Sequence, residues 1–445
     1  MRRFCIALAS VTLITQSVFA QQPVKLSLND CMEYAMKHNY TIKNAQLDVL
    51  IQQAQNNQTA SAAYPHVNGK VDFNKFNIPQ RSFVDGSSFG AAPPGTLIPI
   101  AFTVPYAASA SITTSMLLFD GSVMIALKAR SAALEMVKQS GKVTETGLKY
   151  NIYKAYNSLV IAYRQYDILK NSLVYARSLE HDLEVTRANG FAEKIDVDRT
   201  SVQINNLASD SIRIGNVLTM TEQMLKYQLG MDINTPIILT DTVLEDRKNA
   251  VAAILAEQSS YERVPEFALM NTVLKLNEYN LRRYKLSALP SLSGFWAYGS
   301  NYGSNKFSDI LLFDKYWANS TLGLALNIPI FNGFARVNQV KEAKLNIEKT
   351  QNNIDNIKLT IDFQNAQAKS ALKNAVLQVQ SQRRNVDLSQ SVLDLAQRKY
   401  KAGVGSNIEV TQAQTELLRA QNNYFSSLLE IINAEADLKK AHGDL

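Results

Sequence analysis

Residues 322–333 read Leu-Gly-Leu-Ala-Leu-Asn-Ile-Pro-Ile-Phe-Asn-Gly, and two side-chain patterns meet at their end. Up to Ile330 the apolar residues occupy every second position, as in a β-strand with one apolar and one polar face. From Phe334 to about Lys401 there is no proline. An apolar residue recurs every seven positions from Val340 to Ala375 and, after a four-residue slip, from Val379 to Tyr400, as in a coiled-coil seam. The pattern predicts a strand that leads into a helix about 100 Å long, at 1.5 Å per residue.

The same succession of landmarks occurs earlier in the chain. Leu118-Phe-Asp-Gly121 corresponds to Ile330-Phe-Asn-Gly333 and again precedes a long stretch without proline. Residues 63–69 correspond to 288–294, and the turn at 188–197 corresponds to 402–410. A repeat of this length predicts one duplication of a unit of about 200 residues and excludes a solenoid of short repeats.

The landmarks predict the boundaries of the two copies. The first repeat covers 21–230, with a helix (27–62), a strand pair (64–119), a long helix (121–187) and a return helix (194–229). A linker follows over 231–260. The second repeat covers 261–445, with a helix (261–287), a strand pair (290–331), a long helix (333–401) and a return helix (407–442). In each copy the two shorter helices together match the long one in length, so we expect them to stack end to end beside it.

The four expected strands have the pattern of membrane strands, each about ten residues long with alternating apolar and small polar side chains. An ordinary half-buried soluble sheet fits any one of them equally well. Four strands cannot close around a channel, and open strand edges cannot lie in lipid. Three copies would supply twelve strands, an even number within the range of outer-membrane β-barrels.

The N-terminus has the pattern of an export signal. Arg2 and Arg3 precede an apolar stretch that ends in small residues at Ala20, so residues 1–20 are expected to be a cleaved signal peptide. Its removal leaves Cys31 as the one cysteine, which cannot form an internal disulfide and is expected to be a small buried residue. The charges are scattered without a basic block, which argues against nucleic-acid binding.

No pattern in the chain predicts catalysis or a cofactor. The four histidines, His38, His66, His181 and His442, form no pair with metal-ligand spacing. There is no phosphate-binding loop, dinucleotide fingerprint or nucleophile elbow. We therefore expect no enzyme activity, no cofactor and no metal site.

The chain resembles the TolC-like outer-membrane efflux proteins, the outer membrane factor family. The marks are the duplicated turn, with Tyr400, Gly403, Gly405 and Glu409 in its second copy, and the Phe-Asn-Gly landmark at 331–333. The resemblance extends over essentially the whole mature chain. It implies a fold that is mainly α, with a coiled-coil helical barrel in the periplasm and a twelve-stranded β-barrel shared by a homotrimer in the outer membrane of a Gram-negative bacterium.

The resemblance also implies a set of site residues at the far ends of the long helices. The periplasmic entrance would be narrowed by Asp196 and Glu409, with Gln412 one helical turn on and Tyr400 before the turn. Gly405 stands where the family has a basic residue, and Gln412 where it often has an acid. The two acids have an alternative role as first-turn residues favoured by the helix dipole. The turns themselves, marked by Asn189, Gly190, Gly403 and Gly405, would dock a periplasmic adaptor.

Two classes of function follow from these patterns. The first is the passive outer-membrane exit duct of a tripartite efflux or secretion system, in contact with outer-membrane lipid and fed by an inner-membrane pump or exporter through the adaptor. The alternative is a periplasmic coiled-coil structural or adaptor protein without a channel. The same duct would serve drugs, metals, lipids or proteins, so the sequence leaves the cargo open.

Overall fold

The computed structural model describes residues 23–90, 93–241, 254–255, 260–311 and 316–445. The expected signal peptide and much of the expected linker at 231–260 lie outside the described residues. Within the described residues, no helix combines the length and the apolar character needed to cross a membrane. The chain divides into two compact units. We call them the sheet unit (45–140 and 266–358) and the helical unit (up to 44, 141–265 and 359–445).

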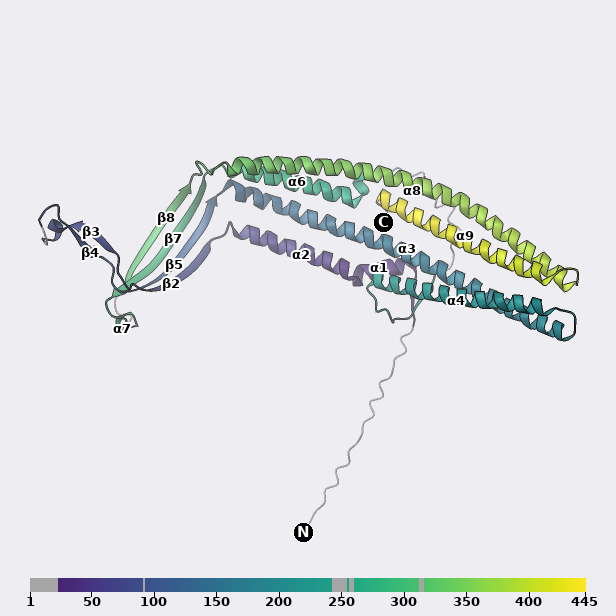
Figure 1. Ribbon diagram of the computed structural model, residues 1–445. Coiled ribbons are helices and arrows are strands. Elements are labelled where there is room, and N and C mark those ends of the chain that lie inside the picture. Colours follow the sequence, from purple (N-terminus) through teal and green to yellow (C-terminus); the bar gives the residue numbers. More distant parts are fainter. Residues whose placement is uncertain (1–22, 91–92, 242–253, 256–259, 312–315) are drawn as a thin grey trace, which may run out of the picture. The chain divides into compact units, whose positions relative to one another are not determined.

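The sheet unit is built on four antiparallel strands in the order β2-β5-β7-β8 (Figure 1). Their bounds are His66–Lys75, Tyr106–Phe119, Ser291–Ser304 and Trp317–Asn327. The four-stranded sheet and the long helices predicted from the sequence are thus confirmed.

The register of the strands places the alternating residues on two distinct faces. Directly paired residues share a face, so Ile112 of β5 lies beside Gly69 of β2 and Tyr298 of β7. By the same rule Trp296 lies beside Leu322. One face of the sheet is therefore apolar across all four strands, and the other carries mostly serine, threonine, asparagine and small residues.

Each strand adjoins a helix. The shorter helices α2 (Tyr40–Ser61) and α6 (Pro265–Leu286) precede β2 and β7, and the long helices α3 (Gly121–Ala188) and α8 (Ala335–Lys401) follow β5 and β8. In the sheet unit α2 pairs with α3 through Asn56 Nδ2, which donates to the carbonyl of Arg130 at 2.9 Å. Asn277 and Thr350 join α6 to α8 at the same distance.

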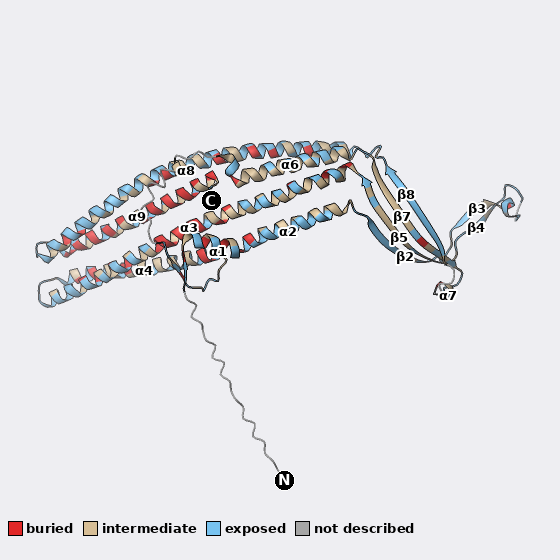
Figure 2. Ribbon diagram, turned by 180° about the vertical axis from the view of Figure 1, so that it is seen from behind, coloured by how far each residue is buried: buried red, intermediate tan, exposed pale blue. Residues whose placement is uncertain are grey.

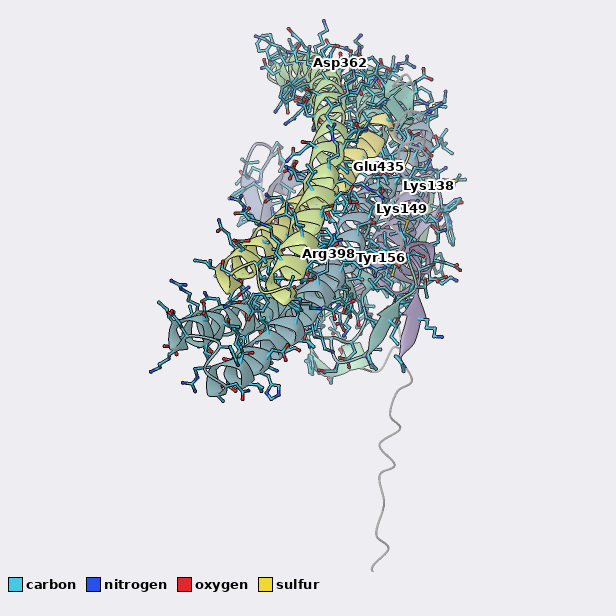
Figure 3. The ribbon with its side chains drawn as sticks, turned by 90° about the vertical axis from the view of Figure 1, so that its right-hand side faces the viewer. Lys138, Lys149, Tyr156, Asp362, Arg398 and Glu435 are labelled. Atoms are coloured by element: carbon cyan, nitrogen blue, oxygen red, sulfur yellow. The ribbon has the colours of Figure 1, made fainter. Side chains whose placement is uncertain are left out.

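The helical unit contains the remainder of α3 and α8 together with α1 (Leu28–His38), α4 (Lys194–Leu229) and α9 (Asn407–His442). Its largest apolar cluster joins α1, α3, α4 and α9 through fully buried residues such as Cys31, Ile152, Leu225 and Ile432. Buried residues recur along most of α9 (Figure 2). Tyr156 of α3 and Glu435 of α9, labelled in Figure 3, are both buried, and Tyr156 donates to Asp241 Oδ2 at 2.9 Å.

Two expected helices differ from the prediction. The helix expected over 27–62 is broken at Asn39, whose backbone is extended (ψ 131°). Asn39 Nδ2 donates to the carbonyl of Gln228, and its Oδ1 accepts from the Thr41 N–H, each at 2.7 Å. The helix expected over 261–287 starts as a 3₁₀ turn, Tyr261–Arg263, and α6 begins only at Pro265, a residue suited to the first helical position.

Within the helical unit, each return helix ends at a left-handed glycine that lies against the residues just before another helix. At Gly230 (φ +70°), just past α4, an added Cβ would lie 2.9 Å from the Cα of Asn39, where α2 begins. At Gly443 (φ +78°), just past α9, it would lie 2.4 Å from the carbonyl oxygen of Arg263, just before α6. The two joints are equivalent in the two copies, and only glycine fits this approach.

The loops and ends contain three smaller features that the sequence did not predict. The loop between β2 and β5 forms a hairpin of β3 (Arg81–Asp85) and β4 (Leu97–Ala101), with a 3₁₀ turn at Gly86–Phe89. β1 (Val24–Leu26) pairs in parallel with β6 (Ile237–Leu239) in the helical unit. A short helix, α7 (Ser308–Leu311), follows β7.

Candidate functional site at the helical tips

Two turns in the helical unit connect α3 to α4 and α8 to α9. Gly190 (φ +82°) and Gly403 (φ +73°) each hold the left-handed position that ends the long helix. In each turn the glycine N–H bonds three residues back and the next N–H bonds five residues back, a Schellman motif that satisfies the last helical carbonyls. Asn189 strengthens the first turn, because its Nδ2 donates to the carbonyl of Val185 at 2.8 Å.

The residue after each glycine is an exposed apolar side chain. Phe191 is 85% exposed and Val404 is 78% exposed, and the two lie 213 residues apart at equivalent positions of the copies. A large apolar residue is therefore exposed at the same place in both turns. Sequence reasoning placed the turns and did not single out these two side chains.

Asp196 and Glu409 occupy equivalent positions in the first turns of α4 and α9. Each is the third residue after its capping residue, where a negative charge interacts favourably with the helix dipole. Glu409 Oε2 lies 3.8 Å from Lys399 Nζ, and both side chains are about half exposed, so the pair adds little to stability. The carboxylate of Glu409 therefore stays accessible to solvent.

Tyr400 lies at the edge of a separate apolar cluster that joins the four helices near the turns. The cluster contains Leu179, Leu183, Val197, Leu393, Ala396, Val410, Ala413 and Leu417. Burial raises the pKa of the Tyr400 hydroxyl, and the negative charges of Asp196 and Asp182 raise it further. Tyr400, in the second repeat, is thus close enough to Asp196, in the first repeat of the same chain, for the aspartate charge to affect its pKa.

Gln412 and Glu409 line one groove between α8 and α9. The groove is lined by Leu388, Val392, Leu395 and Lys399 from α8 and by Glu409, Gln412 and Glu416 from α9. Glu416 supplies a second carboxylate one turn beyond Gln412, paired with Arg419. Sequence reasoning missed Glu416, although it lies seven residues after Glu409 and so falls on the same helix face.

Gly405 is required by the shape of the second turn. A Cβ added at this residue would lie 2.9 Å from both the Cβ of Lys399 and the backbone nitrogen of Tyr400. A basic side chain at this position would therefore displace the backbone of the turn. The conformation of this turn therefore requires glycine at the position where the family has a basic residue.

Asn407 links the tips of the two copies and was not predicted. Its buried Nδ2 donates to the carbonyl of Asp196 and to Thr200 Oγ1, each at 3.3 Å. Thr200, also fully buried, donates to the same carbonyl at 2.9 Å. The sequence held an indication of burial, because apolar residues of α9 recur at steps of three and four from Val410 through Ala413 and Leu417, and Asn407 lies three residues before Val410.

The tips present a half-exposed carboxylate at Glu409 and exposed apolar side chains at Phe191 and Val404. In the described part of the chain, no group of three or more histidine, cysteine, aspartate or glutamate residues could hold a metal ion. The expected site residues fall into two groups, with Asp196 and Tyr400 across α4 and α8, and Glu409 and Gln412 in the groove between α8 and α9.

Comparisons with known proteins agree with this architecture. A family model described as outer membrane efflux protein matches residues 285–444. The chain is 21% identical over 425 residues to the probable efflux pump outer membrane protein TtgC of Pseudomonas putida, covering 94% of this chain and 83% of TtgC. It is 20% identical over 351 residues to the outer membrane protein TolC of Salmonella enteritidis, covering 76% and 69% of the two chains.

A solved structure extends the likeness to the fold. The CmeC outer membrane channel of Campylobacter jejuni matches with a TM-score of 0.74 at 18% identity, covering 94% of this chain and 85% of CmeC. The described elements of both units are therefore arranged in a fold already known from a channel protein.

Proposed function

The chain belongs to the outer membrane efflux protein family, that of TolC, and on that premise we propose that three copies form a passive exit duct for a tripartite efflux or secretion system. As a member of this family it is a channel of the outer membrane of a Gram-negative bacterium and not an enzyme. Its energy source is then a partner, an inner-membrane pump or exporter that delivers cargo through a periplasmic adaptor.

The observation that carries the proposal is the two-faced sheet. On its apolar face Val71 and Leu322 are each 82% exposed, and Trp296 and Tyr298 lie between them on β7. A soluble protein rarely exposes a contiguous apolar surface of this extent. Strands with one apolar and one polar face are the pattern of a sheet between lipid and a water-filled passage.

The edges of the sheet favour assembly from several copies. Among the strands that the structure describes, β2 and β8 each pair with one neighbour and leave one edge open. In lipid every backbone polar group needs a partner, so β8 of one protomer would pair with β2 of the next protomer. Three copies close such a sheet with twelve strands.

The helices next to these edges carry matching apolar stripes. One face of α2 packs on α3, while Leu47, Leu50 and Ile51 on the opposite face are more than half exposed. On α8, Val337 and Leu345 are also more than half exposed. Because α2 leads into β2 and α8 follows β8, pairing of the edge strands brings these two stripes together.

The tips of the helical unit carry the side chains that binding of an adaptor and lining of a periplasmic entrance would need. Phe191 and Val404 offer an apolar contact in each turn, and three copies would present six of them. Asp196, Glu409 and Gln412, with Tyr400 beside Asp196, would line the entrance. A ring of carboxylates at a narrow opening raises the local concentration of cations.

Ion conductance in planar lipid bilayers tests the duct. We expect the purified protein to migrate as a heat-modifiable trimer and to conduct ions without an energy source. A stable monomer without conductance would instead support the alternative, a periplasmic coiled-coil structural or adaptor protein.

The charge reversal Glu409→Lys tests the entrance. It replaces three carboxylates by three ammonium groups in a trimer, so the preference for cations should fall, by roughly twofold or more at low salt, where screening is weak. Glu33→Lys on α1 is the matched control, because Glu33 is exposed and α1 ends against Gly230, at the opposite end of α4 from the tip turn. Unchanged selectivity in a conducting Glu409→Lys trimer contradicts the assignment.

A further inference from the structure

The polar face of the four-stranded sheet is almost free of charge. Strand pairing places Ser109 and Ser111 of β5 on this face, beside Asp72 and Lys70 of β2. Most other residues of the face are serine, threonine, asparagine, alanine or glycine. Of the strand residues that the structure describes, Lys70 and Asp72 are the only lysine, arginine or acidic side chains on the face.

These two charges form an ion pair with each other. Lys70 Nζ lies 2.9 Å from Asp72 Oδ2, and the two residues are successive members of the same face of β2. The lysine side chain is 74% exposed and the aspartate side chain 37%, so the pair lies open to solvent and not in a core. An exposed pair of this kind stabilises the fold by little, so stability does not account for it.

Among the described strand residues of the polar face, no other lysine, arginine or acidic side chain would offset the loss of either member. Along the same level of the sheet, Ser111 is followed by Gly299 on β7 and Asn319 on β8. The Asn319 side chain lies over Gly299, where an added Cβ would meet its Oδ1 at 3.0 Å. Hydroxyl and amide groups solvate ions of both signs and do not favour one of them.

We propose that Lys70 and Asp72 are the residues that set charge selectivity in the membrane-level stretch of the duct, and that as a pair they hold it neutral. The inference rests on the proposed function, in which the polar face lines the passage. Two opposite charges 2.9 Å apart leave only a dipole field, which decays faster than the field of a single charge. A single unpaired charge, in contrast, acts over a screening length of about 10 Å at 0.1 M salt.

For cargo, the consequence is that only one part of the passage discriminates by charge. A neutral wall of hydroxyl and amide groups passes cations, anions and uncharged polar molecules alike. Discrimination by charge is then left to carboxylates at the helical tips, among them Asp196 and Glu409.

Reversal potentials under a KCl gradient test the proposal on single trimers in planar bilayers, with all variants measured at one pH. Asp72→Asn leaves three uncompensated lysines per trimer and should shift the permeability ratio towards anions by roughly twofold at low salt. Lys70→Gln should shift it towards cations by a similar factor. The double variant should return to the parent value.

Lys75→Gln is the matched control. Lys75 is in the same strand but on the opposite face, with Nζ 5.9 Å from the centre of the Tyr106 ring, so its removal should leave the ratio unchanged. Charges elsewhere in the duct are common to all variants and cancel in the comparison. Heat-modifiable mobility verifies that each variant has folded.

The outcomes separate this inference from the proposed function. Conducting trimers in which both single variants keep the parent ratio overturn the role of Lys70 and Asp72 and leave the duct intact. A shift in the double variant equal to that of one single variant also overturns it. If the parent protein itself does not conduct, the proposed function fails first.

Discussion

Gly230 is a residue at which backbone conformation and close approach coincide. Its φ of +70° is costly for any side chain, and a Cβ would also press on the backbone of His38 and Asn39 at 2.9 Å. We expect Gly230→Ala to destabilise the protein by about 1–3 kcal/mol and to lower its melting temperature. Thermal melts followed by far-ultraviolet circular dichroism measure the effect.

Gly147, within α3, is the control for that change. An added Cβ there meets nothing within 4 Å, so Gly147→Ala should be neutral or stabilise the protein by up to ~1 kcal/mol through helix propensity. Equal destabilisation by both substitutions would show that the approach of Gly230 to Asn39 has no special cost.

Cys31 is fully buried in α1, and burial raises the pKa of its thiol to about 12, with smaller contributions from Asp30 and Asp241. Reaction with thiol reagents requires the thiolate, so the folded protein should not react at about pH 8. Denaturant should restore the ordinary thiol pKa and the reactivity. Rapid labelling of the folded protein by a maleimide would contradict the burial of this helix.

Single residues also show where sequence reasoning succeeds and where it stops. The role of Asp196 and Glu409 at an entrance was implied by the resemblance and stays a prediction. Their equivalence in the two turns could be predicted, because it follows from the repeat along the chain. The proximity of Tyr400 to Asp196 could not, since it depends on how α8 packs against α4. Asn407 falls on a seam position, where a polar residue carries no indication of its partner.

Among the elements, the four membrane-type strands and the long helices were predictable because their patterns extend over ten or more residues. The β3–β4 hairpin was missed because its strands have five residues each and Pro99 lies in one of them. β1 and β6 were missed because three residues carry no period and their partners are 213 residues apart. The break at Asn39 arises from a hydrogen bond to Gln228, which no local pattern encodes.

The link between α4 and α9 gives a prediction at the scale of elements. Asn407→Ala removes the donor that joins the first turns of these helices, at a cost of about 1 kcal/mol. We expect the tips to loosen, with faster proteolysis near 189–193 and 402–406 and a larger mean conductance. The control Asn385→Ala, at an exposed position of α8, should change neither the proteolysis rate nor the mean conductance. If Asn407→Ala also behaves like the parent protein, Asn407 does not hold the tips together.

For the whole molecule, the apolar stripe on α2 predicts the basis of assembly. Ile51 is 53% exposed in the single chain and would be covered by α8 of a neighbouring copy. Ile51→Asp places three charges in that interface and should convert trimers to monomers in detergent, as measured by light scattering. Gln53→Asp adds the same charge elsewhere on α2 and should leave trimers intact, so loss of trimers in both variants would contradict the interface.

The glycine joints at Gly230 and Gly443 have a consequence for how the length of such a protein can change in evolution. Seven residues added to α3 within the helical unit move the tip turn outwards, and α4 must gain seven as well, because its far end is fixed against Asn39. Asn407 ties this tip to the other, so α8 and α9 must lengthen in step. The length of the helical unit is thus a property of four helices together, and it changes only by matched insertions in all of them.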